Sequence, residues 1–282
     1  MAVSMEFGLL GQLVVRCDDA VITVSRSRER AVLAALLLRA NELVLVADLA
    51  EALWGDTAPP SAEMTVRNYV KRLRQVLGES GGGRIGTAAG GYRIRVKPGE
   101  LDIARFEQLA SAARVAARAG HFEQVSRPAD AALSLWRGNP LADAGSAMLT
   151  GREVPRLVEM RLQLLETRLD AELRCGGHAQ AVPELRRLAG MYPLREQLHA
   201  TLMLALYRCG QQADALAAYR GVRQLLVDEL GVEPGPGLRQ LHQQILTADP
   251  SLTGTKPTED EPAQDGPLAL PPMVPGFTGR SA

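Results

Sequence analysis

Apolar and polar positions alternate over the first two dozen residues and then change to a helical period. Residues 5–24 alternate short runs rich in Val, Leu and Ile with a turn at residues 17–19, which predicts a small antiparallel sheet. Residues 28–40 contain strong helix formers and one apolar face, and Ser25 or Ser27 can cap this helix. A short β-prone run, LVLV, then leads into a second predicted helix over residues 47–54.

A third helix is predicted between two strong boundary signals. Ser61 follows two prolines and is a favourable N-cap, and Gly78 is a typical C-terminal stop, so residues 62–77 should form one helix. Its two sides differ sharply in polarity. The apolar side consists of Val66, Tyr69, Val70, Leu73, Val76 and Leu77, and the opposite side of Met64, Arg67, Asn68, Lys71 and Gln75, flanked by Arg72 and Arg74.

A glycine cluster separates this helix from a predicted basic hairpin. The run RIGTAAGGYRIRV has two β-prone arms around a Gly-rich tip. Sheet, two helices, capped basic helix and hairpin follow each other in the order of a winged helix-turn-helix. In such a fold a helix can enter the major groove and a basic hairpin can approach phosphates, although a charged stripe can also be a merely solvated face.

The remainder of the chain predicts helices that repeat every 34 residues. A shift by 34 aligns Ala171 with Ala205, Leu173 with Tyr207, Cys175 with Cys209, Gly176 with Gly210, Ala181–Val182 with Ala215–Leu216, and Leu185 with Tyr219. This is the length of a tetratricopeptide repeat. A weaker unit covers residues 106–136, and residues 138–151 are out of period. The expected fold is mainly α, with a winged helix and small sheets at the N-terminus and an all-α repeat region after it.

Three segments follow from these patterns: a winged-helix domain at 5–98, a helical domain at 99–248 and a disordered tail at 249–282 that is rich in Pro, Gly, Thr and acidic residues. Aromatic residues make up only 4% of the chain, which also favours helices over sheet. The formal net charge is zero, but residues 61–97 hold eight basic and two acidic side chains. Positive charge is therefore concentrated on the third helix and the hairpin.

Catalytic and metal chemistry find little support in the sequence. The four histidines, His121, His178, His199 and His242, lack zinc-ligand spacing, and the three cysteines form no CxxC pair. Ser146 lacks a nucleophile elbow, and residues 86–91 lead into a strand and so form a hairpin turn instead of a phosphate loop. No enzyme activity, metal or cofactor is expected. The absence of a leader or an 18-residue apolar run favours a cytoplasmic, nucleoid-associated protein without membrane contact.

The block VRNYVKRLRQVL followed by GGYRI resembles the OmpR/PhoB-type winged helix. Together with RERAVLAALLLRAN, LAEALWGD and DELGVEPGPGLRQLHQQIL, it resembles the Streptomyces antibiotic regulatory protein (SARP) family over about residues 6–247. In that family a bacterial transcriptional activation domain of tetratricopeptide-like helices follows the DNA-binding domain. With no receiver domain before the winged helix and no Walker A motif after residue 247, the sequence resembles the short form.

The resemblance implies a set of residues near DNA and near RNA polymerase. It implies recognition-helix positions for Thr65, Arg67, Asn68, Lys71 and Arg72, and a wing through Thr87 and Arg93, with Tyr92 and Trp54 in the core. The wing tip has Ala88 where arginine is common in response regulators. The expected DNA contacts are completed by Arg74, Ser25, Arg28 and Arg84, and the expected polymerase contacts are Gly55, Asp56 and Thr57.

The expected function is sequence-specific activation of transcription, specific to a pathway of secondary-metabolite biosynthesis. The resemblance implies double-stranded DNA with promoter direct repeats, a dimer on that DNA, and RNA polymerase holoenzyme as partners. The alternative is a helical-repeat scaffold or effector-sensing regulator in which the N-terminal domain binds nucleic acid only weakly.

Overall fold

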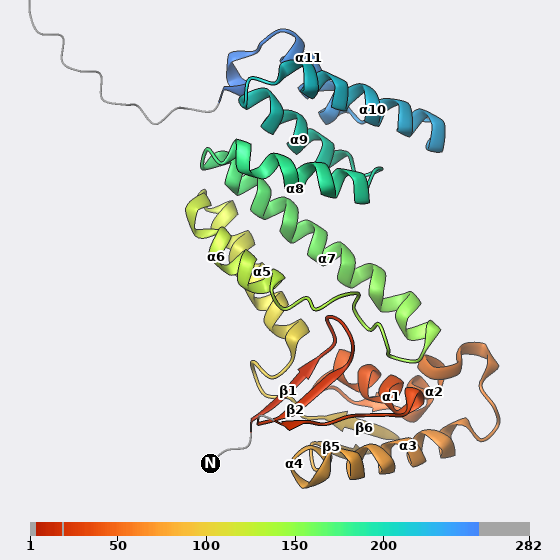
Figure 1. Cartoon of the computed structure of the whole chain (residues 1–282). Helices are drawn as coiled ribbons and strands as arrows, with labels where there is room; N and C mark the ends of the chain where they lie inside the picture. The colour runs from red at the N-terminus through yellow and green to blue at the C-terminus, as the bar shows by residue number, and fades with distance from the viewer. Residues whose placement is uncertain (1–3, 19, 254–282) are drawn as a thin grey trace, which may run out of the picture.

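Two small sheets frame the N-terminal region in the computed structural model (Figure 1). The structure describes residues 4–18 and 20–253, so Asp19 of the predicted turn and residues 254–282 of the predicted tail lie outside it. The first sheet is antiparallel, as predicted, with the order β1 (Met5–Gly8), β2 (Val14–Cys17), β3 (Ala20–Val21). The second has the order β4 (Val44–Leu45), β6 (Gly91–Ile94), β5 (Ile85–Ala88).

The three predicted helices of this region are present, each ending within two residues of its expected boundaries. They are α1 (Ser27–Leu38), α2 (Val46–Trp54) and α3 (Ala62–Val76), with a 3-10 turn η1 (Gly55–Thr57) after α2. The predicted serine cap of α1 is wrong, because the chain enters that helix at Arg26 and Ser27 already lies inside it. Ser61 is the N-cap residue of α3, but its side chain makes no capping hydrogen bond.

The glycine cluster after α3 forms a short helix that the sequence did not predict. Gly78 has a φ of 65°, which turns the chain out of α3 and into α4 (Gly78–Gly82). Gly82 is buried, and a β-carbon there would collide with the backbone of Arg74. Glycine is thus required where α4 folds back against α3 and leads into the hairpin of β5 and β6.

Helices form the remainder of the described chain, as the 34-residue period predicted (Figure 1). The α-helices are α5 (Asp102–Arg118), α6 (Ser126–Leu133), α7 (Ala147–Arg174), α8 (His178–Met191), α9 (Glu196–Arg208), α10 (Gln212–Leu230) and α11 (Pro236–Leu246). The aligned residues are equivalent in space: Gly176 and Gly210 have φ values of 86° and 75° at corresponding turns. Ala181 and Ala215 are both buried one turn into the following helix.

Helix α7 is longer than a repeat helix, with 28 residues, and it belongs to two hydrophobic cores. The first core runs from the N-terminal sheet through the winged helix to α5, α6 and α7, where it includes Leu149, Leu157, Leu164 and Ala171. The second core joins Leu162, Leu165, Leu169 and Leu173 of α7 to α8–α11. Helix α7 begins at Ala147, capped by the Ser146 side chain, and so takes in part of the predicted out-of-period insert. Side-chain packing therefore continues across residue 98.

The predicted disorder is wrong at the start of the tail. Asp249 caps a 3-10 turn, η3 (Pro250–Leu252), and the Leu252 side chain is buried against the second core. The Leu252 carbonyl also accepts a hydrogen bond from Arg208 Nε at 2.9 Å. An apolar side chain and a backbone acceptor thus tie residues 249–253 to α9, which composition alone could not reveal.

A buried carboxylate joins the N-terminal sheet to the helical region. Asp102, the first residue of α5, accepts hydrogen bonds from the backbone N–H groups of Leu9 and Leu10 at 2.8 and 2.9 Å. Arg137 Nη2 lies 2.8 Å from the same carboxylate. Both leucines are fully buried, so no water can replace Asp102 as the acceptor of their N–H groups.

We expect Asp102→Ala to lower the free energy of unfolding by about 3 kcal/mol, because it leaves two buried N–H groups and an arginine without their acceptor. Urea unfolding followed by circular dichroism measures this change. The matched control is Asp48→Ala, which breaks an exposed ion pair with Arg39 and should cost no more than about 1 kcal/mol. Equal effects of the two substitutions would contradict the structural role of Asp102.

Candidate nucleic-acid interface

Helix α3 separates its residues into a packed side and an exposed side. Val66, Val70 and Leu73 are completely buried against the helices of the winged-helix region. The predicted polar side is exposed over most of its length, with Met64, Arg67, Asn68, Lys71, Arg72 and Gln75 open to solvent. Val76, which the sequence placed on the apolar side, is 40% exposed, whereas the next residue, Leu77, is buried.

The predicted contact residues on the first half of α3 have different surroundings. Thr65 is half-buried, and its hydroxyl donates to the carbonyl of Ser61 at 2.9 Å, as is common one turn into a helix. Arg67 pairs with Glu63 at 3.2 Å, but both side chains are more than half exposed. Such exposed pairs contribute little to stability and exchange readily for another anion. Arg67 can therefore leave Glu63 at small cost.

Arg74 points toward the hairpin rather than into open solvent. Its guanidinium donates to the Ile85 carbonyl at 2.7 and 3.0 Å and to Thr87 Oγ1 at 2.9 Å. It also lies over the ring of Tyr92, 5.6 Å from the centroid. Tyr92 is buried, as the resemblance implied. Arg74 and Thr87 thus fasten the β5–β6 hairpin to α3 and set the angle between helix and wing.

Arg84, which precedes β5 and was also predicted to contact DNA, is bonded to another residue of the protein. Arg84 makes a two-pronged ion pair with Glu100 at 2.5 and 3.0 Å, and both side chains are largely buried. Arg93, on β6, is exposed. Of Arg74, Arg84 and Arg93, only Arg93 is exposed. The N–H donors of Arg74 and Arg84 form hydrogen bonds within the protein.

Ser25 and Arg28 lie at the entrance to α1. Ser25 is exposed, and its carbonyl accepts a hydrogen bond from Arg30. Arg28 donates to the carbonyl of Leu53 at 2.6 Å and lies over the half-buried Trp54 ring, 5.6 Å from its centroid. Arg28 therefore links the start of α1 to the end of α2.

Sequence reasoning missed Glu29, an acidic residue beside α3. Glu29 is almost completely buried in the first turn of α1, and its carboxylate lies between Arg26 and Arg72. The signal in the sequence was a single acidic residue on a helix whose other inward positions are Ala, Val and Leu.

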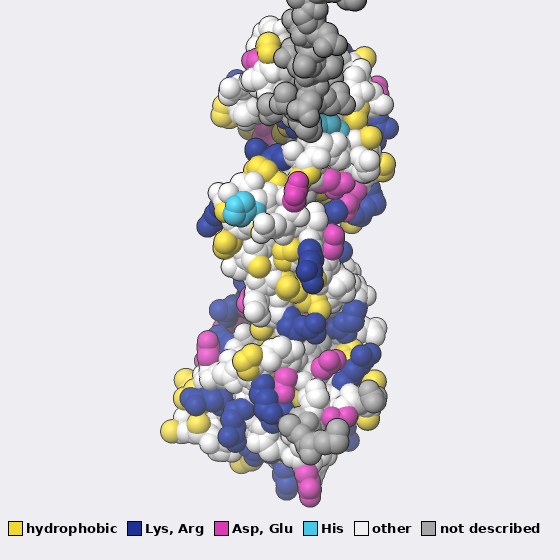
Figure 2. All heavy atoms as spheres, turned by 90° about the vertical axis from the view of Figure 1, so that its left-hand side faces the viewer, with side chains coloured by type: hydrophobic (Ala, Val, Ile, Leu, Met, Phe, Trp, Pro, Cys, Tyr) yellow, Lys and Arg dark blue, Asp and Glu magenta, His cyan; other side chains and the backbone are white. Residues whose placement is uncertain are grey.

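Positive side chains are frequent over the lower part of the face in Figure 2, where the winged helix lies, together with some acidic ones.

The predicted polymerase-contact residues lie where the winged helix meets α7. Asp56 and Thr57 are exposed, and the Thr57 hydroxyl donates to the Trp54 carbonyl at 2.7 Å. Gly55 turns the chain with a φ of 56°, and a β-carbon there would lie 3.1 Å from the Met148 side chain of α7. The Ser146 hydroxyl also donates to the Ala52 carbonyl. The position of this loop is therefore set partly by the helical region.

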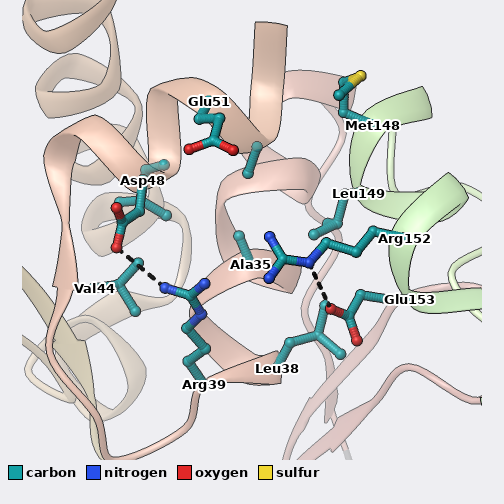
Figure 3. A pocket seen from close by; sticks show the side chains of 12 residues that line it. Ala35, Leu38, Arg39, Val44, Asp48, Glu51, Met148, Leu149, Arg152 and Glu153 are labelled. Atoms are coloured by element: carbon teal, nitrogen blue, oxygen red, sulfur yellow. Dashed lines mark hydrogen bonds and ion pairs between the residues drawn. The ribbon is translucent and has the colours of Figure 1, made fainter. Parts of the chain in front are cut away.

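A cavity of about 160 Å³ lies in the same junction (Figure 3). Its floor is apolar, with Leu38, Val44 and Leu149 among the lining side chains. Arg39 pairs with Asp48 along one wall, and Arg152 extends from α7 beside Glu153. The cavity is small, and opposite charges from both regions surround it. It lies between α1, α2 and the start of α7, next to the loop.

Residues 4–18 and 20–253 contain no cluster of three or more His, Cys, Asp or Glu side chains that could hold a metal ion. Ser146 acts as the helix cap described above, and His242 stacks on Tyr219 with 3.8 Å between ring centroids. In that same part of the chain, every helix is too short or too polar to cross a bilayer. Residues 86–91 belong to the β5–β6 hairpin, as predicted, with the turn itself at residues 89–90.

The fold and this surface define a class: a winged-helix regulator joined to a helical-repeat domain. The family model of the bacterial transcriptional activator domain matches residues 101–246, and that described as transcriptional regulatory protein, C terminal, matches residues 22–94. The chain belongs to the SARP family of transcriptional regulators, which confirms the resemblance seen in its sequence.

Several known regulators are similar to the chain over most of its length. It is 45% identical over 282 residues to regulatory protein AfsR of Streptomyces coelicolor, but spans only 28% of that protein. It is 38% identical to regulatory protein DnrI of Streptomyces peucetius, covering 90% of this chain and 96% of DnrI. The solved structure of Mycobacterium tuberculosis EmbR in complex with a low-affinity phosphopeptide matches with a TM-score of 0.84 and 36% identity, over 89% of this chain and 68% of that one.

The Arg84–Glu100 pair predicts a pH-dependent loss of stability. Burial by itself raises the pKa of Glu100, but hydrogen bonds from Arg84 and from the Lys97 N–H outweigh it, so the pKa lies below its ordinary 4.5. A lowered folded-state pKa means that the pair stabilises the fold above pH 4.5 and that this contribution is lost as the pH falls through the folded-state value. We expect Arg84→Gln to cost about 2 kcal/mol at neutral pH and progressively less in acid.

Urea unfolding at a series of pH values measures the difference between wild type and Arg84→Gln. Arg93→Gln is the matched control, since it removes an exposed arginine from the adjacent strand and should change little at any pH. A difference that stayed constant into acid would show that the ion pair is not the origin of the loss.

Proposed function

We propose that this chain is a sequence-specific DNA-binding transcriptional activator that docks α3 in the major groove. The observation that carries the proposal is the exposed face of α3, where Arg67, Asn68 and Lys71 stand opposite a completely buried apolar face. These side-chain types form hydrogen bonds with base edges and phosphates. Arg74 fixes the β5–β6 wing beside the helix, so that Arg93 lies on the hairpin that would flank the DNA backbone.

Family membership supports a proposal about the biological setting. We propose that the chain activates a pathway of secondary-metabolite biosynthesis and binds direct repeats near its promoters as a dimer, in the cytoplasm at the nucleoid. Repeats contacted from one face of the duplex should recur at about 10–11 base pairs. A footprint on the promoter region beside the gene should therefore show two protected segments with that spacing. A scaffold that bound nucleic acid only weakly would give no footprint at comparable concentrations.

Two residues on the exposed face of α3 provide the sharpest test. Replacing Arg67 or Lys71 by Ala should weaken specific binding by about 1–3 kcal/mol where the side chain contacts a base. Where the side chain contacts phosphate, the replacement should lower the salt slope, which is the slope of log affinity against log salt concentration, by about one. Fluorescence anisotropy with the footprinted duplex over a range of salt concentrations measures both. Arg118→Ala, which removes an exposed arginine of α5, serves as the control. Unchanged affinity and slope in both α3 variants would remove α3 from the interface.

The loop after α2 is proposed to contact RNA polymerase. Asp56 and Thr57 are exposed at the end of α2, and the loop rests on Met148 of α7. Asp56→Ala and Thr57→Ala should leave the footprint intact but reduce transcription, because neither side chain lies on α3 or the wing. Transcription reconstituted with purified polymerase measures the reduction. Full activation by both variants would move the proposed polymerase contact away from this loop.

A further inference from the structure

A buried carboxylate lies between the first turn of α1 and the exposed face of α3. The Glu29 side chain is only 3% exposed, and its Oε1 atom makes no hydrogen bond within the described residues. Two guanidinium groups lie nearby without being hydrogen-bonded to it: Arg26 Nη1 at 3.7 Å and Arg72 Nη1 at 3.9 Å. Those two side chains are 63% and 50% exposed. The acid is inside the protein, and its two partners are at the surface.

The stability of the fold does not account for this arrangement. Taking a carboxylate out of water is costly unless hydrogen bonds replace those of the solvent, and Oε1 lacks such a bond. Glutamate at the third position of a helix often bonds back to the N-cap N–H, but Oε1 of Glu29 does not. The positive end of the helix dipole offsets only a small part of the cost. An apolar side chain here would suit the core better.

We propose that Arg26 and Arg72 form a clamp for a backbone phosphate of DNA, in which Glu29 is the positioning residue. This rests on the proposed function. A guanidinium has five N–H donors, so an arginine directed toward Glu29 through one edge keeps others for a phosphate oxygen. Holding two long side chains in place before binding lowers the entropy lost on binding. Because Glu29 itself is buried, the phosphate would meet only the arginines.

The clamp also explains why the two arginines come from different helices. Arg26 precedes α1, whereas Arg72 lies in the last third of α3, and α1 packs directly on α3. One phosphate held by both would fix the rotation of α3 about its own axis relative to the DNA backbone. That rotation decides which of the exposed α3 side chains reach base edges.

The test is Glu29→Gln, for which charge and positioning predict opposite results. Removing a negative charge near DNA should tighten binding if charge alone matters. The clamp predicts instead a loss of about tenfold, because the arginines are no longer held. Arg26→Ala and Arg72→Ala should each lower the slope of log affinity against log salt concentration by about one. Glu29→Gln should cost less affinity when Arg72 is already Ala, because only Arg26 then remains to be held. Anisotropy with a duplex of mixed sequence suffices, since phosphate contacts do not depend on sequence.

Glu63→Gln is the matched control, because Glu63 is an exposed acid paired with Arg67 on the same helix. It should leave binding unchanged or tighten it. Thermal unfolding of every variant separates folding from positioning. If Glu29→Gln fails to fold, Arg72→Lys carries the test, since it keeps the charge and should keep the slope while losing affinity.

Three outcomes are distinguishable. Weaker binding by folded Glu29→Gln with reduced slopes for both arginine variants supports the clamp. Binding by Glu29→Gln that matches or exceeds wild type, or unchanged slopes in both arginine variants, overturns the clamp and leaves the proposed function standing. Wild-type protein without salt-dependent binding overturns the proposed function and the clamp with it.

Discussion

The carboxylate of Asp102 satisfies two backbone N–H groups that the N-terminal sheet leaves unpaired inside the protein. Around it the loop before α7 follows the end of β1, with the N–H groups of Arg137 and Leu141 bonded to the carbonyls of Leu10 and Leu9 at 2.8 and 2.9 Å. Because Leu9, Leu10 and Leu141 are buried, their backbone groups cannot exchange partners with water. The sheet and the first helical hairpin therefore form one packed body, and a single core runs through both.

The junction between the winged helix and the helical region also positions the loop after α2. Helix α7 starts beside α2, so Met148 lies under the loop at Gly55 and Ser146 bonds to α2. The same helix continues for 28 residues into the second core. The loop proposed to contact polymerase and the second core are thus joined through one helix, and the cavity lies beside the start of that helix.

The arginines of the winged helix divide into two groups with different roles. Arg74 and Arg84 use their donors on Ile85, Thr87 and Glu100 and thereby hold the hairpin. Arg67 and Arg93 remain at the surface. A basic segment is therefore a poor measure of a DNA-binding face, because a guanidinium is equally suited to bonding the protein's own carbonyls. The exposed group keeps its N–H donors available for direct hydrogen bonds with a nucleic acid.

The sequence alone determined the order of the elements, the buried side of α3 and the equivalence of repeats 34 residues apart. These are local properties, since the period of apolar residues and the position of glycine act within one or two turns of chain. Only the tertiary structure decided the partners of Arg74 and Arg84, the burial of Glu29, and the packing of Leu252 onto α9. Each of these depends on a contact with another helix, strand or loop of the fold. Whether a charged side chain stabilises the fold or is available to a partner is therefore known only once the positions of both segments are known.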